Sequence, residues 1–247
     1  MADPRLRLTL RELRRDRAYR RRIMRLVRLM APAYAREVEA LYGRDLAEEM
    51  LPELLRQTEE LVVAAPYIGG RSNRLSRNLY LTAPLLALHR GLQARGKPLE
   101  EIAGIIYRGT AAAYAHPAYA ALLRLQGALL FTRLGRARLR RDAARRQLRR
   151  YPDDWVMEVV EGEGFELGVD YTECGIVKYL KANGAPELAP YLCLLDYPMC
   201  DRMHVHLDRA ETIAAGGERC TFRFQRWAGP HEVALAGPAG AGPRVDA

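Results

Sequence analysis

The fold of this chain is decided by the segment YPDDWVMEVVEGEGFELGVDY (residues 151–171), where the spacing of apolar residues changes. From residue 5 to about 150, Leu, Ile, Ala and Tyr recur at intervals of three and four residues, which predicts helices. Residues 155–161 and 165–171 are short runs rich in β-branched and aromatic residues, and the glycine-containing link between them favours a hairpin. The segment therefore predicts an α+β protein in which the helical part comes first.

The flanking sequence extends this prediction to the whole chain. Proline and glycine divide residues 1–150 into helical segments that we expect to form a bundle. After the hairpin we expect a helix from Thr172 to Ala182, another from Pro186 to about Met199, and strands at 204–210 and 219–227. Residues 151–227 thus form a predicted ββ-helix-helix-ββ unit with a small antiparallel sheet, packed on the bundle. Residues 228–247, rich in glycine, proline and alanine, predict a flexible tail.

The composition restricts the class of protein. The chain has 247 residues, and its hydrophobic content of 49% is enough for a substantial core. It contains no uncharged apolar run of about 18 residues, so we expect no transmembrane helix and no membrane partner. The arginine-rich N-terminus lacks the apolar region and cleavage site of a signal peptide, which predicts a cytoplasmic protein.

The formal net charge of +9 raises the question of nucleic-acid binding. The arginines gather in residues 11–28 and 133–150, where apolar residues alternate with them at helical spacing. Such a pattern is typical of a solvated helix face whose long side chains cover apolar surface. We therefore expect a small-molecule substrate and no nucleic-acid partner; the sequence does not predict the oligomeric state.

All four cysteines lie between residues 174 and 220. A reducing cytoplasm disfavours disulfides, so the cluster indicates catalytic, metal-binding or inert thiols. Cys193 and Asp196 are three residues apart on a predicted helix, which places a thiol and a carboxylate on one face. Cys174 lies in the first turn of its predicted helix, where amide groups and the dipole favour a thiolate.

The remaining two cysteines differ in their predicted surroundings. Strand alternation places Cys220 on one face with Phe222 and Phe224, and Arg223 on the other face. Cys200 fits no recognisable pattern and is expected to be a buried small residue, an interpretation that stays open for every cysteine here.

A metal site is a further open interpretation. His204 and His206 project to one face of a predicted strand, so Cys193, Cys220 and the two histidines could supply mixed thiolate and imidazole ligands. The chain lacks the closely spaced cysteine pair that is typical of zinc sites. We therefore expect no cofactor.

Three stretches together resemble a known family. They are PYIGGRSN (66–73), NGAPELAPYLCLLDY (183–197) and RAETIAAGGERCTFRF (209–224), with Glu173-Cys174 before the second stretch. Their order and spacing are similar to those of the L-2-amino-thiazoline-4-carboxylic acid hydrolase family, over about residues 55 to 226. The resemblance implies a helical first half, an α+β second half, and hydrolytic opening of a sulfur-containing, amidine-like ring to an N-carbamoyl cysteine.

By position, the resemblance implies a site made of Cys174, Cys193, Asp196 and Cys220, with Gly69, Gly70 and Asn73 in a glycine-pair loop. Thr221 is a departure, because the family commonly has an aspartate after the last cysteine. We expect Cys193 to attack an sp² carbon of a C=N or C=O bond, Asp196 to move the proton, and Cys220 or Cys174 to assist. Arg71 and Arg223 are candidates for gripping a substrate carboxylate, and ordinary surface arginines are the competing interpretation.

Two other functions stay open. The Cys-x2-Asp spacing with a distant cysteine also resembles organomercurial lyases, which suggests cleavage of a carbon–heteroatom bond by paired thiols. The order of elements is similar to that of vinyl-reductase-type ligand-binding domains, which suggests a small-molecule sensor without turnover. An enzyme requires Cys193 and Asp196 to lie close together, whereas a sensor tolerates their separation.

Overall fold

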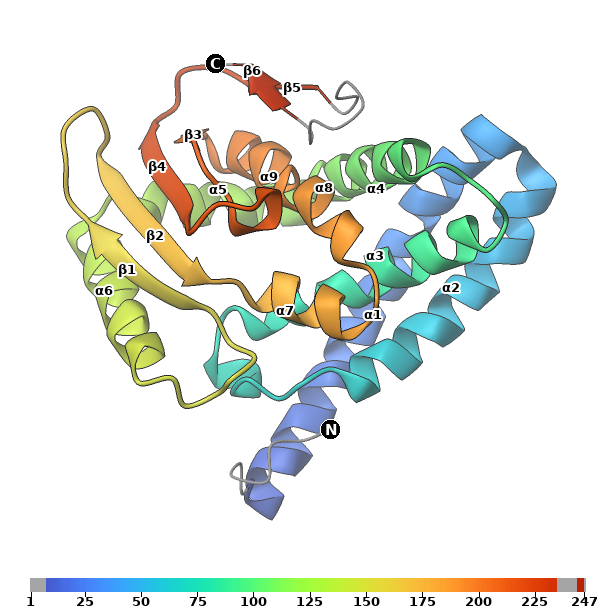
Figure 1. The fold of residues 1–247 in the computed structure, drawn as a ribbon, viewed down its shortest axis with the longest axis horizontal. Coiled ribbons are helices and arrows are strands. Elements are labelled where there is room, and N and C mark those ends of the chain that lie inside the picture. The colour runs from blue at the N-terminus through green and yellow to red at the C-terminus, as the bar shows by residue number, and fades with distance from the viewer. Residues whose placement is uncertain (1–7, 235–243, 247) are drawn as a thin grey trace.

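The computed structural model describes residues 8–234 and 244–246. Its first part is helical, as the apolar spacing predicts; the first, second and fourth helices pack around α3, whereas the fifth and sixth lie mainly against the second part of the chain (Figure 1). The helices are α1 (Leu10–Tyr42), α2 (Arg44–Ala64), the 3₁₀ turn η1 (Gly70–Ser72), α3 (Ser76–Gln93), α4 (Leu99–Tyr114), α5 (Pro117–Leu130) and α6 (Arg133–Gln147).

The second part contains the predicted strands and helices, except that the helix expected from Thr172 begins at Gly175, because Thr172 and Glu173 continue the preceding strand. A four-stranded antiparallel sheet has the order β1-β2-β4-β3, so the predicted α+β class is confirmed. The elements are β1 (Val156–Val160), β2 (Leu167–Glu173), α7 (Gly175–Ala182), η2 (Pro186–Leu188), α8 (Ala189–Cys193), α9 (Asp196–Met203), β3 (Val205–Asp208), η3 (Ile213–Ala215) and β4 (Cys220–Arg226).

The predicted helix from Pro186 to about Met199 is wrong in one respect, because it is divided into η2, α8 and α9. Between α8 and α9 the amides of Leu194 and Leu195 bond to carbonyls three residues back, as in a 3₁₀ turn. Pro198 follows and has no amide hydrogen to bond the carbonyl of Leu194. Since residues three apart eclipse in a 3₁₀ turn, Cys193 and Asp196 still lie on one side.

One core cluster connects the two parts of the chain. Helix α3 is buried along most of its length and contacts α2, α4 and α7. The same cluster contains Leu79 and Ile105 from the bundle and Trp155 and Leu180 from the second part. The bundle and the sheet-containing part therefore share apolar packing.

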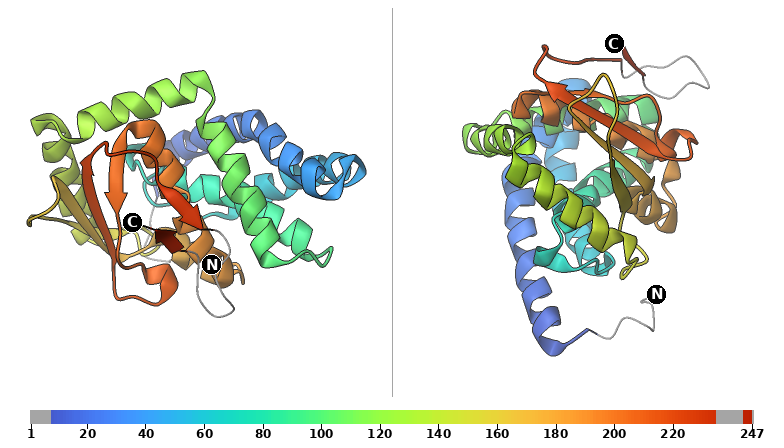
Figure 2. Two further views of the ribbon diagram at one scale, coloured as in Figure 1. Left: turned by 90° about the horizontal axis from the view of Figure 1, so that it is seen from above. Right: turned by 90° about the vertical axis from the view of Figure 1, so that its left-hand side faces the viewer.

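The sheet presents one face to the helices. Helix α6 lies against β1 (Figure 2). Ala143 of α6 packs with Met157 and Val169. Phe222 and Phe224 of β4 pack against the same cluster, so the predicted strand alternation holds. Residues on alternate positions, including Asp170 and Arg223, lie on the opposite face.

The last residues are described in part. Strands β5 (Glu232–Ala234) and β6 (Arg244–Asp246) pair antiparallel. The other residues of the predicted flexible tail, 235–243 and 247, lie outside the described residues. None of the described helices combines the length and apolar character needed to cross a membrane.

Candidate active site

Four of the predicted site residues come together from separate elements. Cys193 ends α8, Asp196 begins α9, Cys174 precedes α7 as its N-cap, and Cys220 begins β4. Burial is the main cause of the raised pKa of the Cys193 thiol, and Asp196, together with Cys174 and Cys220 when these are ionised, lies close enough to add to it. All four cysteines of the chain are free thiols. The fold therefore gathers three thiols and a carboxylate that are distant in sequence.

Arg209, which has no predicted role, links Asp196 to the backbone of Cys193. Its Nη1 donates to Oδ2 of Asp196 at 2.7 Å, and its Nη2 donates to the carbonyl oxygen of Cys193 at 2.8 Å. The guanidinium also stacks on the rings of Tyr197 and Phe222, at 5.1 and 5.0 Å from their centroids. Only 2% of the Arg209 side chain is exposed, so its charge is compensated mainly by Asp196.

Sequence reasoning could not assign this role. Arg209 lies within the stretch 209–224 that resembles the hydrolase family, but arginine is abundant throughout the chain. Its partner Asp196 lies thirteen residues earlier in the chain, at the start of α9. The only local signal is an arginine directly after a short strand.

Burial controls the ionisation of the thiols. It raises the pKa of Cys193 far above the ordinary range, with the Arg209 charge opposing the shift. It also raises the pKa of Cys174 to about 11, and the backbone amides of Val177 and Ile176 offset this only in part. The expectation that the helix N-terminus favours a thiolate at Cys174 is therefore wrong, because desolvation outweighs the amides.

The carboxyl group is in a similar environment. Burial raises the pKa of Asp196, and the charge and hydrogen bond of Arg209 lower it. Yet 31% of the Asp196 side chain remains exposed, and Cys174 and Cys193 are also partly exposed. The three residues are thus surrounded by protein while each keeps part of its surface exposed, and for Asp196 that surface includes the side chain.

The other two cysteines are buried. The Cys220 sulfur accepts a hydrogen bond from the amide of Ile213 at 3.3 Å, and its strand neighbour on β2 is Tyr171. Cys200 is 1% exposed and packs with Leu194, Tyr197 and Leu207, as expected of a structural cysteine. Cys220 is therefore a buried member of the thiol cluster, whereas Cys200 belongs to the adjoining apolar core.

The structure does not bring Arg223 to the cysteines. Its guanidinium donates to Asp170 Oδ1 at 2.5 Å and lies over the ring of Phe165. Arg223 occupies the face of β4 opposite to Phe222, which stacks on Arg209. Arg223 therefore lies on the face of the sheet opposite to α6 and binds Asp170 there.

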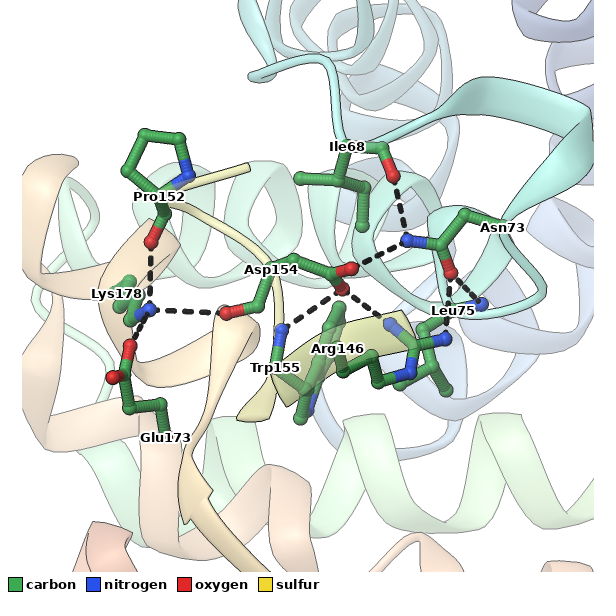
Figure 3. A network of polar contacts seen from close by, with 9 residues as sticks. All are labelled: Ile68, Asn73, Leu75, Arg146, Pro152, Asp154, Trp155, Glu173 and Lys178. Atoms are coloured by element: carbon green, nitrogen blue, oxygen red, sulfur yellow. Dashed lines mark hydrogen bonds and ion pairs between the residues drawn. The ribbon is translucent and has the colours of Figure 1, made fainter. Parts of the chain in front are cut away.

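The glycine-pair loop forms a separate polar network (Figure 3). Asn73 donates to the carbonyl of Ile68 and to Asp154, and its side-chain oxygen accepts from Arg146 and from the amide of Leu75. These four bonds use the full hydrogen-bonding capacity of the Asn73 side chain. None of these four partners is a site residue, so the structure gives Asn73 a scaffolding role.

The two glycines of this loop have backbone conformations that favour glycine. Gly69 and Gly70 have φ values of 108° and 52°. A Cβ on Gly70 would lie 2.9 Å from Asp16 Oδ1, so the backbone approaches α1 closely there. Arg71, the next residue of the loop, is exposed.

The two histidines of the alternative metal-site interpretation have other neighbours. His204 stacks on Trp227 and contacts Arg124, whereas His206 stacks on His231 at 4.8 Å. Among residues 8–234 and 244–246, no group of three or more His, Cys, Asp or Glu side chains has the geometry to hold a metal ion. The thiols and these histidines are therefore not arranged as one ligand set.

Comparison with known proteins points to one family. A family model described as L-2-amino-thiazoline-4-carboxylic acid hydrolase matches residues 88–224, more than half of the chain. The match includes all four cysteines, Asp196 and Arg209, whereas the glycine-pair loop precedes it. No curated protein and no solved structure matches the chain.

Proposed function

Because the chain belongs to the L-2-amino-thiazoline-4-carboxylic acid hydrolase family, we propose that it opens a small cyclic amidine of the thiazoline type. The family supports a hydrolase-type function in general. The proposal adds a site, made of Cys193, Asp196 and Arg209 with Cys174 and Cys220 beside them, and a substrate that bears a carboxylate.

The observation that carries the proposal is the convergence of Cys193 and Asp196 with a buried arginine. Arg209 fixes the carboxylate of Asp196 and the backbone of Cys193 with two parallel N–H donors. Such rigid placement of a nucleophile beside a proton acceptor is what covalent catalysis requires. The Asp196 side chain is 31% exposed and Cys193 keeps part of its residue surface exposed, which gives a small ring an approach to the pair.

The proposed reaction has two stages. In the first, the Cys193 sulfur bonds to the ring carbon between sulfur and nitrogen, the ring C–S bond breaks, and the ring sulfur leaves as a thiol. In the second, water attacks the same carbon, the bond to Cys193 breaks, and an N-carbamoyl cysteine is released. For a cyclic amidine without ring sulfur, the ring C–N bond breaks instead.

Asp196 handles the protons of both stages. Burial keeps the Cys193 thiol protonated in the free protein, so its proton must move as the sulfur attacks. Asp196 accepts this proton and passes it to the departing ring sulfur. In the second stage it accepts a proton from the attacking water and returns it to the Cys193 sulfur as that bond breaks, while the other water proton goes to the former ring nitrogen. Arg209 favours the ionised carboxylate that this role needs.

The test is turnover of L-2-amino-thiazoline-4-carboxylate, measured as release of a new thiol by the full-length chain. We expect Cys193→Ala to abolish turnover and Asp196→Asn to lower kcat by about a hundredfold or more, as for loss of a general base. Cys200→Ala is the matched control, because it removes a buried thiol from the adjoining core. Full activity of Cys193→Ala would refute the nucleophile.

Binding without turnover is the second candidate function. The observation that favours it is that burial raises the pKa of Cys174, Cys193 and Cys220, so the free protein holds thiols rather than thiolates. A sensor would bind the thiazoline acid with no thiol release and no covalent adduct at Cys193. Mass spectrometry of the protein mixed with substrate separates the two functions, since the enzyme forms a transient adduct.

A further inference from the structure

A cavity of about 330 Å³ lies away from the cysteine cluster, between the glycine-pair loop and the end of α6. Five arginines line it, namely Arg74, Arg145, Arg146, Arg149 and Arg150. The only acidic residues in the lining are Asp142 and Asp154. None of the four cysteines and neither Asp196 nor Arg209 lines it. The cavity is thus a strongly basic space distinct from the proposed active site.

Three of the five arginines have acidic partners. Arg146 binds Asp154 at 2.6 Å, Arg149 pairs with Glu173, and Arg150 lies 3.8 Å from Glu12. These ion pairs hold three arginine side chains of the cavity lining in place. Because Arg146 is only 7% exposed and also donates to Asn73, the wall next to the glycine-pair loop is rigid.

The guanidinium groups of Arg74 and Arg145 form no ion pair or hydrogen bond with any of the described residues, although both residues keep exposed surface and the Arg74 guanidinium is partly surrounded by protein. They come from different elements, Arg74 following η1 and Arg145 lying in the last turn of α6. Burial and the nearby charges of Arg138 and Arg77 lower the pKa of Arg74, with Asp142 opposing the shift. Two guanidinium groups therefore face a small cavity with little compensating negative charge.

We propose that this cavity binds a small oxyanion ligand with more than one negative charge, either a phosphate or a polycarboxylate, gripped by Arg74 and Arg145. A guanidinium offers two parallel N–H donors that match phosphate and carboxylate oxygens. The volume is near the lower end of the range for small-molecule sites, which fits a compact ligand. The rigid Arg146–Asp154–Asn73 wall keeps the ordering cost of binding low.

The experiment is isothermal titration calorimetry of the full chain with three probes: inorganic phosphate, citrate and acetate. We expect phosphate, citrate or both to bind, and acetate, with one charge, to bind more weakly. Arg74→Ala and Arg145→Ala should each weaken that binding about tenfold or more, the usual cost of a charge-assisted hydrogen bond. Preference for phosphate or for citrate identifies the ligand class.

Two controls keep the result specific. Arg141→Ala removes one charge from α6 outside the cavity lining, and its affinity should equal that of the wild type. Cys193→Ala should also bind normally, because the cavity is separate from the proposed active site. Arg74→Gln and Arg145→Gln, checked by circular dichroism, replace the alanine variants if these fail to fold. Absence of binding, or equal weakening by Arg141→Ala, overturns the proposal.

Discussion

Arg209 is the residue on which the charge balance of the candidate active site depends. It is almost fully buried, and its main electrostatic partner is the Asp196 carboxylate at 2.7 Å. We expect Arg209→Ala to lower the free energy of unfolding by about 3 kcal/mol, the usual cost of removing one partner of a buried ion pair. Urea denaturation at neutral pH measures the free energy of unfolding of this variant and of the wild type.

The matched control for this prediction is Arg202→Ala, which removes an exposed arginine from α9. It should change the free energy of unfolding by less than about 0.5 kcal/mol. The double variant Arg209→Met with Asp196→Leu should recover part of the loss, because it leaves no unpaired charge. An Arg209→Ala protein as stable as Arg202→Ala would contradict the ion-pair argument.

The raised pKa of the Cys174 thiol predicts that the stability of the protein depends on pH. Its pKa rises from 9.0 to about 11 in the folded protein, so folding favours the protonated thiol. This contribution to stability is fully present below pH 9.0, the ordinary pKa, and is lost as the pH rises through about 11. Thermal unfolding from pH 8 to pH 11 should show a smaller fall in Tm for Cys174→Ala than for the wild type. Parallel curves would show that the thiol is not the titrating group.

At the scale of elements, the glycine-pair loop depends on a close approach of backbone to α1. Gly70 has φ +52°, and a Cβ there would lie 2.9 Å from Asp16 Oδ1. We expect Gly70→Ala to lower the free energy of unfolding by about 2 kcal/mol, from backbone strain and from the clash. Gly184→Ala is the control, since its φ is +71° but nothing lies within 4 Å of its added Cβ. Equal losses in the two variants would show that the contact with Asp16 does not matter.

The elements also show what the sequence could predict. The alternation in residues 219–227 correctly separated Phe222 from Arg223, because strand faces follow from a local period of two. The break between α8 and α9 escaped prediction, since apolar spacing continues through it and only Pro198 marks it. The cluster of thiols was anticipated from spacing and family resemblance together, whereas Arg209 was missed because its ion pair depends on tertiary placement. Arg223 failed to join the site because its bond to Asp170 is likewise tertiary.

On the scale of the whole molecule, the two predicted regions share one core. Leu79 and Ile105 of the bundle belong to the same buried cluster as Trp155 and Leu180 of the second part. Each region therefore needs the other to bury the apolar side chains of this shared cluster. The proposed active site depends on this union, since Cys174 and Cys193 flank α7 and α8, which pack on the bundle.

We therefore expect one cooperative unfolding transition. Far-UV circular dichroism reports mainly the helices, whereas tryptophan fluorescence reports the second part, because the chain has 2 tryptophans and both follow residue 150. The two probes should give the same midpoint in urea. Ile105→Ala in α4 and Leu180→Ala in α7 should each shift both curves together by about 2–5 kcal/mol, the range for buried large-to-small changes. If Ile105→Ala moved only the dichroism curve, the bundle would unfold independently, and the shared core would not couple the two regions.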